Sequence, residues 1–279
     1  TSLPEVLTSI RSLNQNTPNL AAGNLLGSNT FNMLLLAVVD IAYRNQRVLR
    51  KAALKHALTG SLAVMLIGLA VFFILADIDI KIGWVGLDSL LLIIGYILAV
   101  RLIQSNNAPV DKSVLPEIPK DTPSLKKGII GFLLAAGVLV IVTPIMVKNA
   151  NTIAEITGLG SSFIGTTLVA LVTSLPELVT TLAAVKIGAS DMAIGNLFGS
   201  NMFNMFAMGL TDLFYTQGRF LAAIDPSFLI IGMFGLLMTV LALIGNLAKL
   251  ERKIWFVEID ALALIILYIL SIWLLYSRA

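Results

Sequence analysis

The chain has 279 residues, of which 57% are hydrophobic and 13% charged, and its mean hydropathy is +0.92. A soluble domain has about 25% charged residues, so this composition indicates a membrane protein. A formal net charge of +3 gives no sign of a nucleic-acid partner, and the lack of cysteine excludes disulfides and thiolate metal sites.

Runs of about 20 apolar residues, the length that crosses a bilayer as a helix, recur along the chain. After a shorter apolar piece at about 1–13, spans are predicted near 20–42, 58–76, 83–103, 128–148, 163–187, 190–214, 225–247 and 258–276. The most polar connections are about 44–56, 104–127 and 246–257. Prolines and mixed charges make 104–127 a predicted solvated linker. We therefore expect an all-α polytopic membrane protein.

Two motifs occur twice in the chain. Thr-Ser-Leu-Pro-Glu stands at 1–5 and at 173–177, and Gly-Asn-x-x-Gly-Ser-Asn-x-Phe-Asn-Met stands at 23–33 and at 195–205. Both pairs share an offset of 172 residues, and about 17 of the first 40 residues are identical at that offset. Chance does not produce such a match, so the sequence predicts an internal repeat.

The two repeats are unequal in length at their N-terminal ends. The span 128–148 and the start of the next precede Thr173, whereas nothing precedes Thr1. We expect roughly 45 residues of the parent protein to be absent and Thr1 to begin inside a helix. Five spans per repeat, an odd number, would invert the second repeat relative to the first. The predicted domains are 1–103 (incomplete first repeat), 104–127 (cytoplasmic linker) and 128–279 (second, inverted repeat).

The basic residues are distributed unequally between the two predicted sides of the membrane. The side with loops 44–56, 104–127 and 248–257 has 14 Lys and Arg residues, and the other side has five. The positive-inside rule makes these loops cytoplasmic and places the C-terminus on the outer side. We expect a multi-pass protein of the cell (inner) membrane, with the first motif running from inside to outside and the second in reverse.

Glu5 and Glu177 lie within apolar stretches, and the nearest basic residues in those stretches, Arg11 and Lys186, are six and nine residues away. Ionisable groups at such positions are costly and usually mark an ion path. The preceding Pro4 and Pro176 each predict a break or kink in the helix, which would free backbone oxygens beside the carboxylate. Discontinuous helices of this kind form midplane ion sites in transporters.

Helical spacing brings more oxygen atoms to the same place. Side chains four residues apart share a helix face, as do Thr1 with Glu5, Thr173 with Glu177, Ser28 with Asn32, and Ser200 with Asn204. Carboxylate, hydroxyl and amide oxygens without sulfur or imidazole suit hard cations such as Ca²⁺ and Na⁺. The Gly-x-x-x-Gly patterns beside them predict close helix packing. Asp40 and Asp212 lie near span ends, where a capping role is the better interpretation.

At these motifs the sequence resembles the calcium/cation antiporter superfamily, specifically the prokaryotic sodium/calcium exchangers. The match is to both alpha repeats of that family, at 1–5 with 23–32 and at 173–177 with 195–204. The resemblance implies two inverted-topology five-helix repeats, ten spans in the parent, with the first span and the start of the second absent here. It also implies ion sites between the second, third, seventh and eighth spans.

The resemblance further implies which residues bind the transported ions. Glu5 and Glu177 would be the central ligands of Ca²⁺ and Na⁺. Other oxygen ligands, from hydroxyl, amide or backbone groups, would be Thr1, Ser2, Ser28, Asn32, Ala170, Thr173, Ser174, Ser200 and Asn204. Some relatives have aspartate at the position of Asn204, so asparagine there lowers the charge of the site and argues against potassium co-transport.

We therefore expect a secondary active transporter that exchanges Na⁺ for Ca²⁺ by alternating access, without a cofactor and without enzymatic activity. Its partners would be the transported Ca²⁺ and Na⁺ ions and the lipid bilayer, with no nucleic acid. An alternative is a Ca²⁺/H⁺ antiporter of the same fold, because either glutamate could take up a proton. A channel conflicts with the inverted repeats, and an intramembrane enzyme conflicts with the lack of a His-Glu-x-x-His motif.

Overall fold

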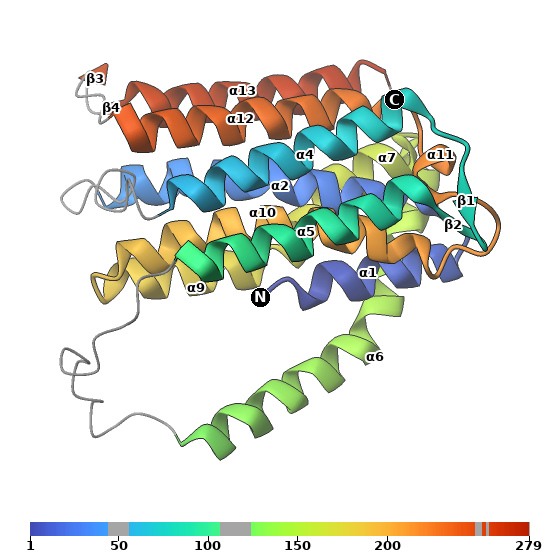
Figure 1. The fold of residues 1–279 in the computed structure, drawn as a ribbon, viewed down its shortest axis with the longest axis horizontal. Coiled ribbons are helices and arrows are strands. Elements are labelled where there is room, and N and C mark those ends of the chain that lie inside the picture. The colour runs from blue at the N-terminus through green and yellow to red at the C-terminus, as the bar shows by residue number, and fades with distance from the viewer. Residues whose placement is uncertain (44–55, 107–123, 249–252, 255–256, 279) are drawn as a thin grey trace.

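The structure is a computed structural model that describes residues 1–43, 56–106, 124–248, 253–254 and 257–278. Long helices lie side by side along the long axis of the molecule, and their connections gather at its two ends (Figure 1). The first half comprises α1 (Leu3–Asn14), α2 (Pro18–Ala42), α4 (Ala57–Ala76), strands β1 (Lys81–Ile82) and β2 (Val85–Gly86), and α5 (Leu87–Asn106).

The second half begins with the longest helix, α6 (Leu125–Thr157). A broken span follows, made of α7 (Gly160–Ile164), the π-helical turn η2 (Gly165–Val169), α8 (Ala170–Thr173) and α9 (Leu175–Lys186). The remaining elements are α10 (Ser190–Asp212), α11 (Phe220–Ala223), α12 (Phe228–Ala248), strands β3 (Lys253–Ile254) and β4 (Val257–Glu258), and α13 (Ile259–Tyr276).

The two halves repeat the same elements at the offset of the motifs. The pairs α1 and α9, β1 and β3, and α5 and α13 each begin 172 residues apart. The two hairpins also have the same register, with Lys81 opposite Gly86 and Lys253 opposite Glu258. Thus the offset read from two motifs also relates elements near the ends of both halves.

Six helices of the described residues are long and apolar enough to cross a membrane, namely α2, α4, α5, α6, α12 and α13. The pair Gly160–Thr173 and Leu175–Lys186, bent by 41°, would form a seventh span. The 23-residue α10 is not among them because asparagine, serine and aspartate interrupt its apolar sequence. The predicted all-α polytopic membrane fold is confirmed.

Some details differ from the prediction. α6 continues to Thr157 instead of ending near residue 148, with Pro144 in its interior, and it stops where Gly158 adopts a positive φ of 69°. Hydropathy marks the part of a helix that lies in lipid, so it misses a polar continuation. The two hairpins were not predicted. Loops 44–56, 104–127 and 248–257 lie largely outside the described residues.

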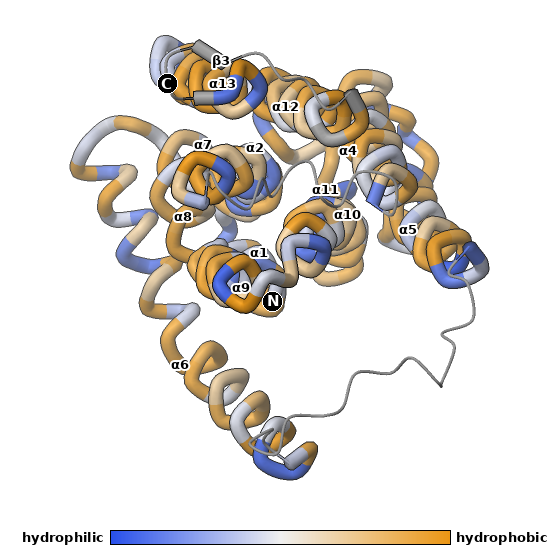
Figure 2. Tube along the Cα trace, turned by 90° about the vertical axis from the view of Figure 1, so that its left-hand side faces the viewer, coloured by the Kyte–Doolittle hydropathy of each residue, from blue (hydrophilic) through white to orange (hydrophobic). Residues whose placement is uncertain are grey.

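α6 diverges from the bundle, and after a hydrophilic start its first half is mostly hydrophobic (Figure 2). Only 6% of its most apolar segment is buried, and Phe132 and Leu134 are 63% and 68% exposed. α2, by contrast, lies among the other helices and is 78% buried over its most apolar segment. The bundle is therefore built around α2, with α6 at its edge.

The glycines of α2 allow another backbone to approach closely. A Cβ atom on Gly27 would lie 2.5 Å from the Thr166 carbonyl oxygen, and one on Gly23 would lie 2.8 Å from the Thr166 nitrogen. The predicted close packing is confirmed for the first Gly-x-x-x-Gly pattern, at 23–27, where α2 contacts η2. It is wrong for Gly199, the counterpart of Gly27, because a Cβ there meets nothing within 4 Å in the described part of the chain.

These two glycines give a matched test of packing. Gly27→Ala should lower the free energy of unfolding by about 1–3 kcal/mol, because the added methyl group meets backbone atoms that cannot rotate away. Gly199→Ala should change it by less than about 0.5 kcal/mol. Thermal denaturation of both variants in detergent checks this expectation, and equal shifts would contradict it.

Candidate cation-binding site

Glu5 and Glu177 each lie in the first turn of a helix, one residue after a proline. Pro4 and Pro176 fit there because the first backbone N–H groups of a helix have no acceptor within the helix. Ser174 separates α8 from α9, and the chain bends by 41° between them, which confirms the predicted break. The bend places a helix N-terminus inside a span, where the helix dipole favours a carboxylate.

Each glutamate accepts a hydrogen bond from the serine that precedes the other glutamate. Ser2 Oγ donates to Glu177 Oε1 at 2.8 Å, and Ser174 Oγ donates to Glu5 Oε1 at 3.4 Å. The two bonds are equivalent at the offset of 172 residues, because each joins the serine of one half to the glutamate of the other. Reciprocal contacts of this kind are typical of a two-fold interface. Glu5 and Glu177 are 1% and 0% exposed. The two carboxylates therefore lie close together between α1 and α9.

A second reciprocal pair of hydrogen bonds links the threonines of the motif to asparagines. Thr173 Oγ1 donates to Asn24 Oδ1 at 2.8 Å, and Thr1 Oγ1 donates to Asn196 Oδ1 at 3.2 Å. Asn24 also donates through Nδ2 to the backbone carbonyl of Glu5 at 3.0 Å. Asn24 thereby ties the end of α8 to the first turn of α1.

A third reciprocal pair joins α2 to α10. Asn32 Nδ2 donates to Asn201 Oδ1 at 3.0 Å, and Asn204 Nδ2 donates to Asn29 Oδ1 at 2.9 Å. All four side chains are at most 1% exposed. The amide nitrogens of Asn32 and Asn204 both donate across the helix pair. The carbonyl oxygens of these two residues are therefore available for another interaction.

Several buried oxygen atoms of these helices have no hydrogen-bond partner among the described residues. A buried oxygen without a partner costs about 1–3 kcal/mol, so a group of them indicates that something else binds there. Five of them are Glu5 Oε2, Glu177 Oε2, Ser28 Oγ, Asn32 Oδ1 and Asn204 Oδ1, and three others belong to Thr8, Thr166 and Ser190. The first five belong to residues that the sequence predicted as ligands, and oxygen atoms are the ligands that hard cations prefer.

The other predicted ligands are already hydrogen-bonded. Ser200 Oγ donates to Glu177 Oε1 at 3.1 Å and accepts from Ser2, whereas its counterpart Ser28 has an unpaired hydroxyl. The Ala170 carbonyl accepts the Ser174 N–H at 3.0 Å, as it does in any helix. The Thr173 hydroxyl also lies within hydrogen-bond distance of this oxygen, at 3.3 Å.

The site contains two carboxyl groups and no basic side chain paired with them among the described residues. Within the described part of the chain, neither Glu5 nor Glu177 forms an ion pair, and the three ion pairs found there all involve Arg219. Asp212, predicted as a cap, accepts the N–H groups of Gly86 at 2.7 Å and Phe220 at 2.6 Å and is confirmed in that role. The two glutamates are thus left without a protein cation to neutralise them.

Sequence reasoning missed four residues that hold the predicted ligands in place: Asn24, Asn29, Asn196 and Asn201. They recur at the same offset as the glutamates, which was a usable signal. Their role depends on contacts between the halves, and periodicity within one helix does not reveal such contacts.

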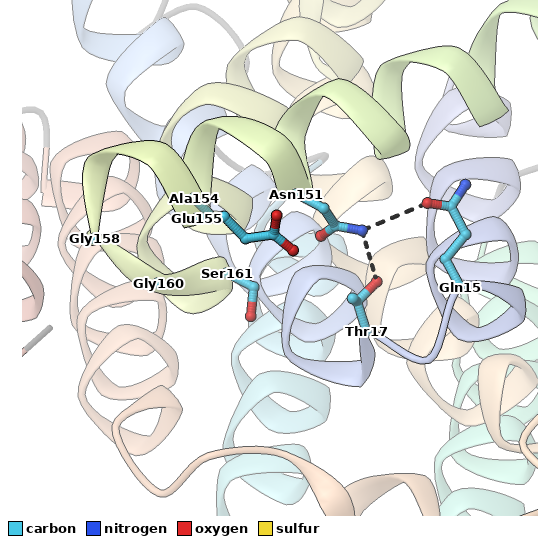
Figure 3. A pocket seen from close by; sticks show the side chains of 8 residues that line it. All are labelled: Gln15, Thr17, Asn151, Ala154, Glu155, Gly158, Gly160 and Ser161. Atoms are coloured by element: carbon cyan, nitrogen blue, oxygen red, sulfur yellow. Dashed lines mark hydrogen bonds between the residues drawn. The ribbon is translucent and has the colours of Figure 1, made fainter.

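Two pockets lie near these helices. One of about 500 Å³ is lined by Thr1, Ser2 and Ser200, so it reaches the edge of the predicted site. Another of about 470 Å³ lies where the α1–α2 turn meets the end of α6, and Asn151 donates there to Gln15 and Thr17 at 3.5 Å (Figure 3). The second pocket contains none of the predicted ligands.

Comparisons with known proteins identify the family and the fold. A family model described as "Sodium/calcium exchanger protein" matches residues 1–103 and 127–277. The inner membrane protein YrbG of Escherichia coli is 30% identical over 230 residues, which cover 81% of this chain and 68% of YrbG. The protein named CaxA of Alkalimonas amylolytica is 30% identical over 74% of this chain, but the match spans only 64% of its own length.

Two solved structures share the fold. The sodium-calcium exchanger NCX_Mj gives a TM-score of 0.60 at 24% identity, covering 97% of this chain and 81% of its own. An H⁺/Ca²⁺ exchanger named CAX gives a TM-score of 0.71 at 15% identity, covering 99% and 74%. At these identities the likeness establishes the fold alone.

Proposed function

The chain belongs to the sodium/calcium exchanger family, a family of transporters and not of enzymes, and from that membership we propose that it exchanges Na⁺ for Ca²⁺ by alternating access. The observation that carries this proposal is the pair of buried glutamates, Glu5 and Glu177. Each is held by a serine of the other half and has one oxygen atom without a partner among the described residues.

The proposed ligands form a shell of oxygen atoms between α1, α2, α8, α9 and α10. Ca²⁺ takes six to eight oxygen ligands at 2.3–2.6 Å, as a rule including carboxylates. The two glutamates supply the negative charge that neutralises one Ca²⁺. The neutral oxygens come from Thr1, Ser2, Ser28, Asn32, Ala170, Thr173, Ser174, Ser200 and Asn204.

The same two charges explain why transport would be coupled. A pair of empty carboxylates is expensive to enclose away from water, whereas a pair that holds Ca²⁺ or several Na⁺ is nearly neutral. The protein then changes conformation only when loaded, so one ion must return for the other to leave. With three Na⁺ for each Ca²⁺, one net charge would move, and the membrane potential would contribute about 2.3 kcal/mol per 100 mV.

We propose further that the halves 1–103 and 128–279 are inverted repeats joined by the linker 104–127. The support comes from α2 and α10, which occupy equivalent positions in the two halves and run antiparallel. Asn16, just before α2, accepts a hydrogen bond from Gln217, just after α10, at 2.8 Å. The three reciprocal pairs of hydrogen bonds fit the same two-fold relation.

The membrane topology is also a proposal. The end of α2, the start of α4, the end of α5 and the β3–β4 hairpin lie at one end of the molecule in Figure 1, and α11 and the end of α13 lie at the other. This grouping agrees with cytoplasmic loops 44–56, 104–127 and 248–257 and an outer C-terminus. We assign the protein to the cell (inner) membrane as a multi-pass protein.

Transport by the wild-type protein decides which ion is coupled. In proteoliposomes loaded with Na⁺, we expect ⁴⁵Ca²⁺ uptake that collapses when K⁺ replaces the internal Na⁺. A proton gradient without Na⁺ should give no uptake above that of protein-free vesicles. The reverse pattern would establish the Ca²⁺/H⁺ alternative, and uptake that needs no counter-ion gradient would indicate a channel.

A further inference from the structure

The asparagines Asn29 and Asn201 stand directly behind two of the proposed cation ligands. Asn29 Oδ1 accepts the Asn204 Nδ2 group at 2.9 Å, and Asn201 Oδ1 accepts the Asn32 Nδ2 group at 3.0 Å. The carbonyl oxygens of Asn32 and Asn204 are buried and have no partner among the described residues. In both places one end of an amide is paired with another amide and its other end is left free.

The orientation of an amide matters for a cation. The two ends of an asparagine side chain have almost the same shape, but one is a carbonyl acceptor and the other an NH₂ donor. If Asn32 were rotated by half a turn, its NH₂ group would face the cation and its oxygen would face the oxygen of Asn201. Both contacts would be repulsive as long as Asn201 keeps its own orientation.

The second pair is anchored more firmly than the first. Asn201 Nδ2 donates to the Asn29 backbone carbonyl at 3.3 Å and to Thr239 Oγ1 at 3.4 Å, which fixes the direction of Asn201 Oδ1. Asn29 Nδ2 has no partner among the described residues. Within the described residues no contact fixes the orientation of the Asn29 amide, so it can rotate together with Asn204, and only Asn201 selects the orientation of its partner.

We infer that Asn201 is a positioning residue that makes the amide of Asn32 present its oxygen atom to the transported cation. The inference rests on the proposed exchange function, since it assigns a role to a residue behind one of the same ligands. It predicts that a ligand with oxygen at both ends, such as an aspartate, needs no positioning residue.

The test uses Asn201→Leu in two backgrounds, the wild type and Asn32→Asp, with the full chain in proteoliposomes. In the wild type, Asn201→Leu leaves the two orientations of the Asn32 amide about equally populated, so the KM for Ca²⁺ should rise by about twofold more than it does in Asn32→Asp, with kcat unchanged. In Asn32→Asp the ligand has no donor end, so any change in KM there measures packing alone.

The outcomes separate this inference from the function on which it rests. Equal increases in KM in the two backgrounds would mean that Asn201 acts through packing, and would overturn the inference. An unchanged KM in Asn201→Leu would overturn it as well. If the wild type shows no Na⁺-dependent Ca²⁺ uptake in the same vesicles, the proposed function is wrong and the inference falls with it.

Discussion

Glu177→Gln should abolish Na⁺-driven ⁴⁵Ca²⁺ uptake, with a loss of at least about a hundredfold. Glutamine keeps the shape of the side chain and an oxygen acceptor but removes one of the two charges that would neutralise Ca²⁺. Removing the carboxylate from a buried pair of carboxylate and cation costs about 3–5 kcal/mol, which corresponds to a loss of at least that size. Glu5→Gln should behave in the same way, since Glu5 and Glu177 have reciprocal partners.

Glu155→Gln is the matched control for this loss. Glu155 is an exposed carboxylate on α6 and lies in the pocket that contains none of the predicted ligands (Figure 3). Its substitution removes the same charge and should leave uptake within about twofold of the wild type. Full residual uptake by a folded Glu177→Gln protein would defeat the assignment of Glu177 as a ligand.

Arg219→Met should lower the free energy of unfolding by about 3–5 kcal/mol, because it leaves buried negative charge without a partner. Arg219 lies between α10 and α11 with a side chain that is 5% exposed, and it pairs with Asp88 at 3.1 Å, Asp79 at 3.2 Å and Asp77. Burial opposes its charge, yet its hydrogen bond to Asp77 and the surrounding carboxylates keep the pKa of Arg219 above its ordinary value. The side chain joins the α4–α5 connection to the end of α10.

Two further variants separate the buried ion pair from the exposed ones. Asp79 is 79% exposed, so Asp79→Asn should change stability by less than about 1 kcal/mol. Asp88 is fully buried, so Asp88→Asn should recover part of the stability lost in Arg219→Met. Thermal denaturation in detergent measures all three. No recovery in the double variant would mean that Arg219 stabilises this end of the bundle by packing alone.

The spans were predictable because hydropathy and helix length act locally. The span at 190–214 became α10, although its apolar sequence is the most interrupted. The break at Pro176 was predictable from one residue, since proline has no N–H group. Pro144, by contrast, lies inside the continuous α6. The difference between the two prolines depends on tertiary packing, which the local sequence does not contain.

The residues of the proposed site could be identified from the motif, but the contacts between them could not. Nothing in the sequence distinguishes Ser200, which donates to Glu177, from Ser28, whose hydroxyl has no partner among the described residues. The π-helical turn η2 also has no sequence signature, yet it is the backbone against which Gly27 packs. Such features arise from contacts between halves that are 172 residues apart.

The crossed bonds between serine and glutamate have a mechanical consequence. Because Ser2 holds Glu177 and Ser174 holds Glu5, each carboxylate has its hydroxyl partner only while α1 and α9 stay in register. A small slide of one helix past the other would stretch both contacts at once, since the two bonds are reciprocal. In the proposed transport cycle, the affinity for the cation and the relative position of α1 and α9 would then change together.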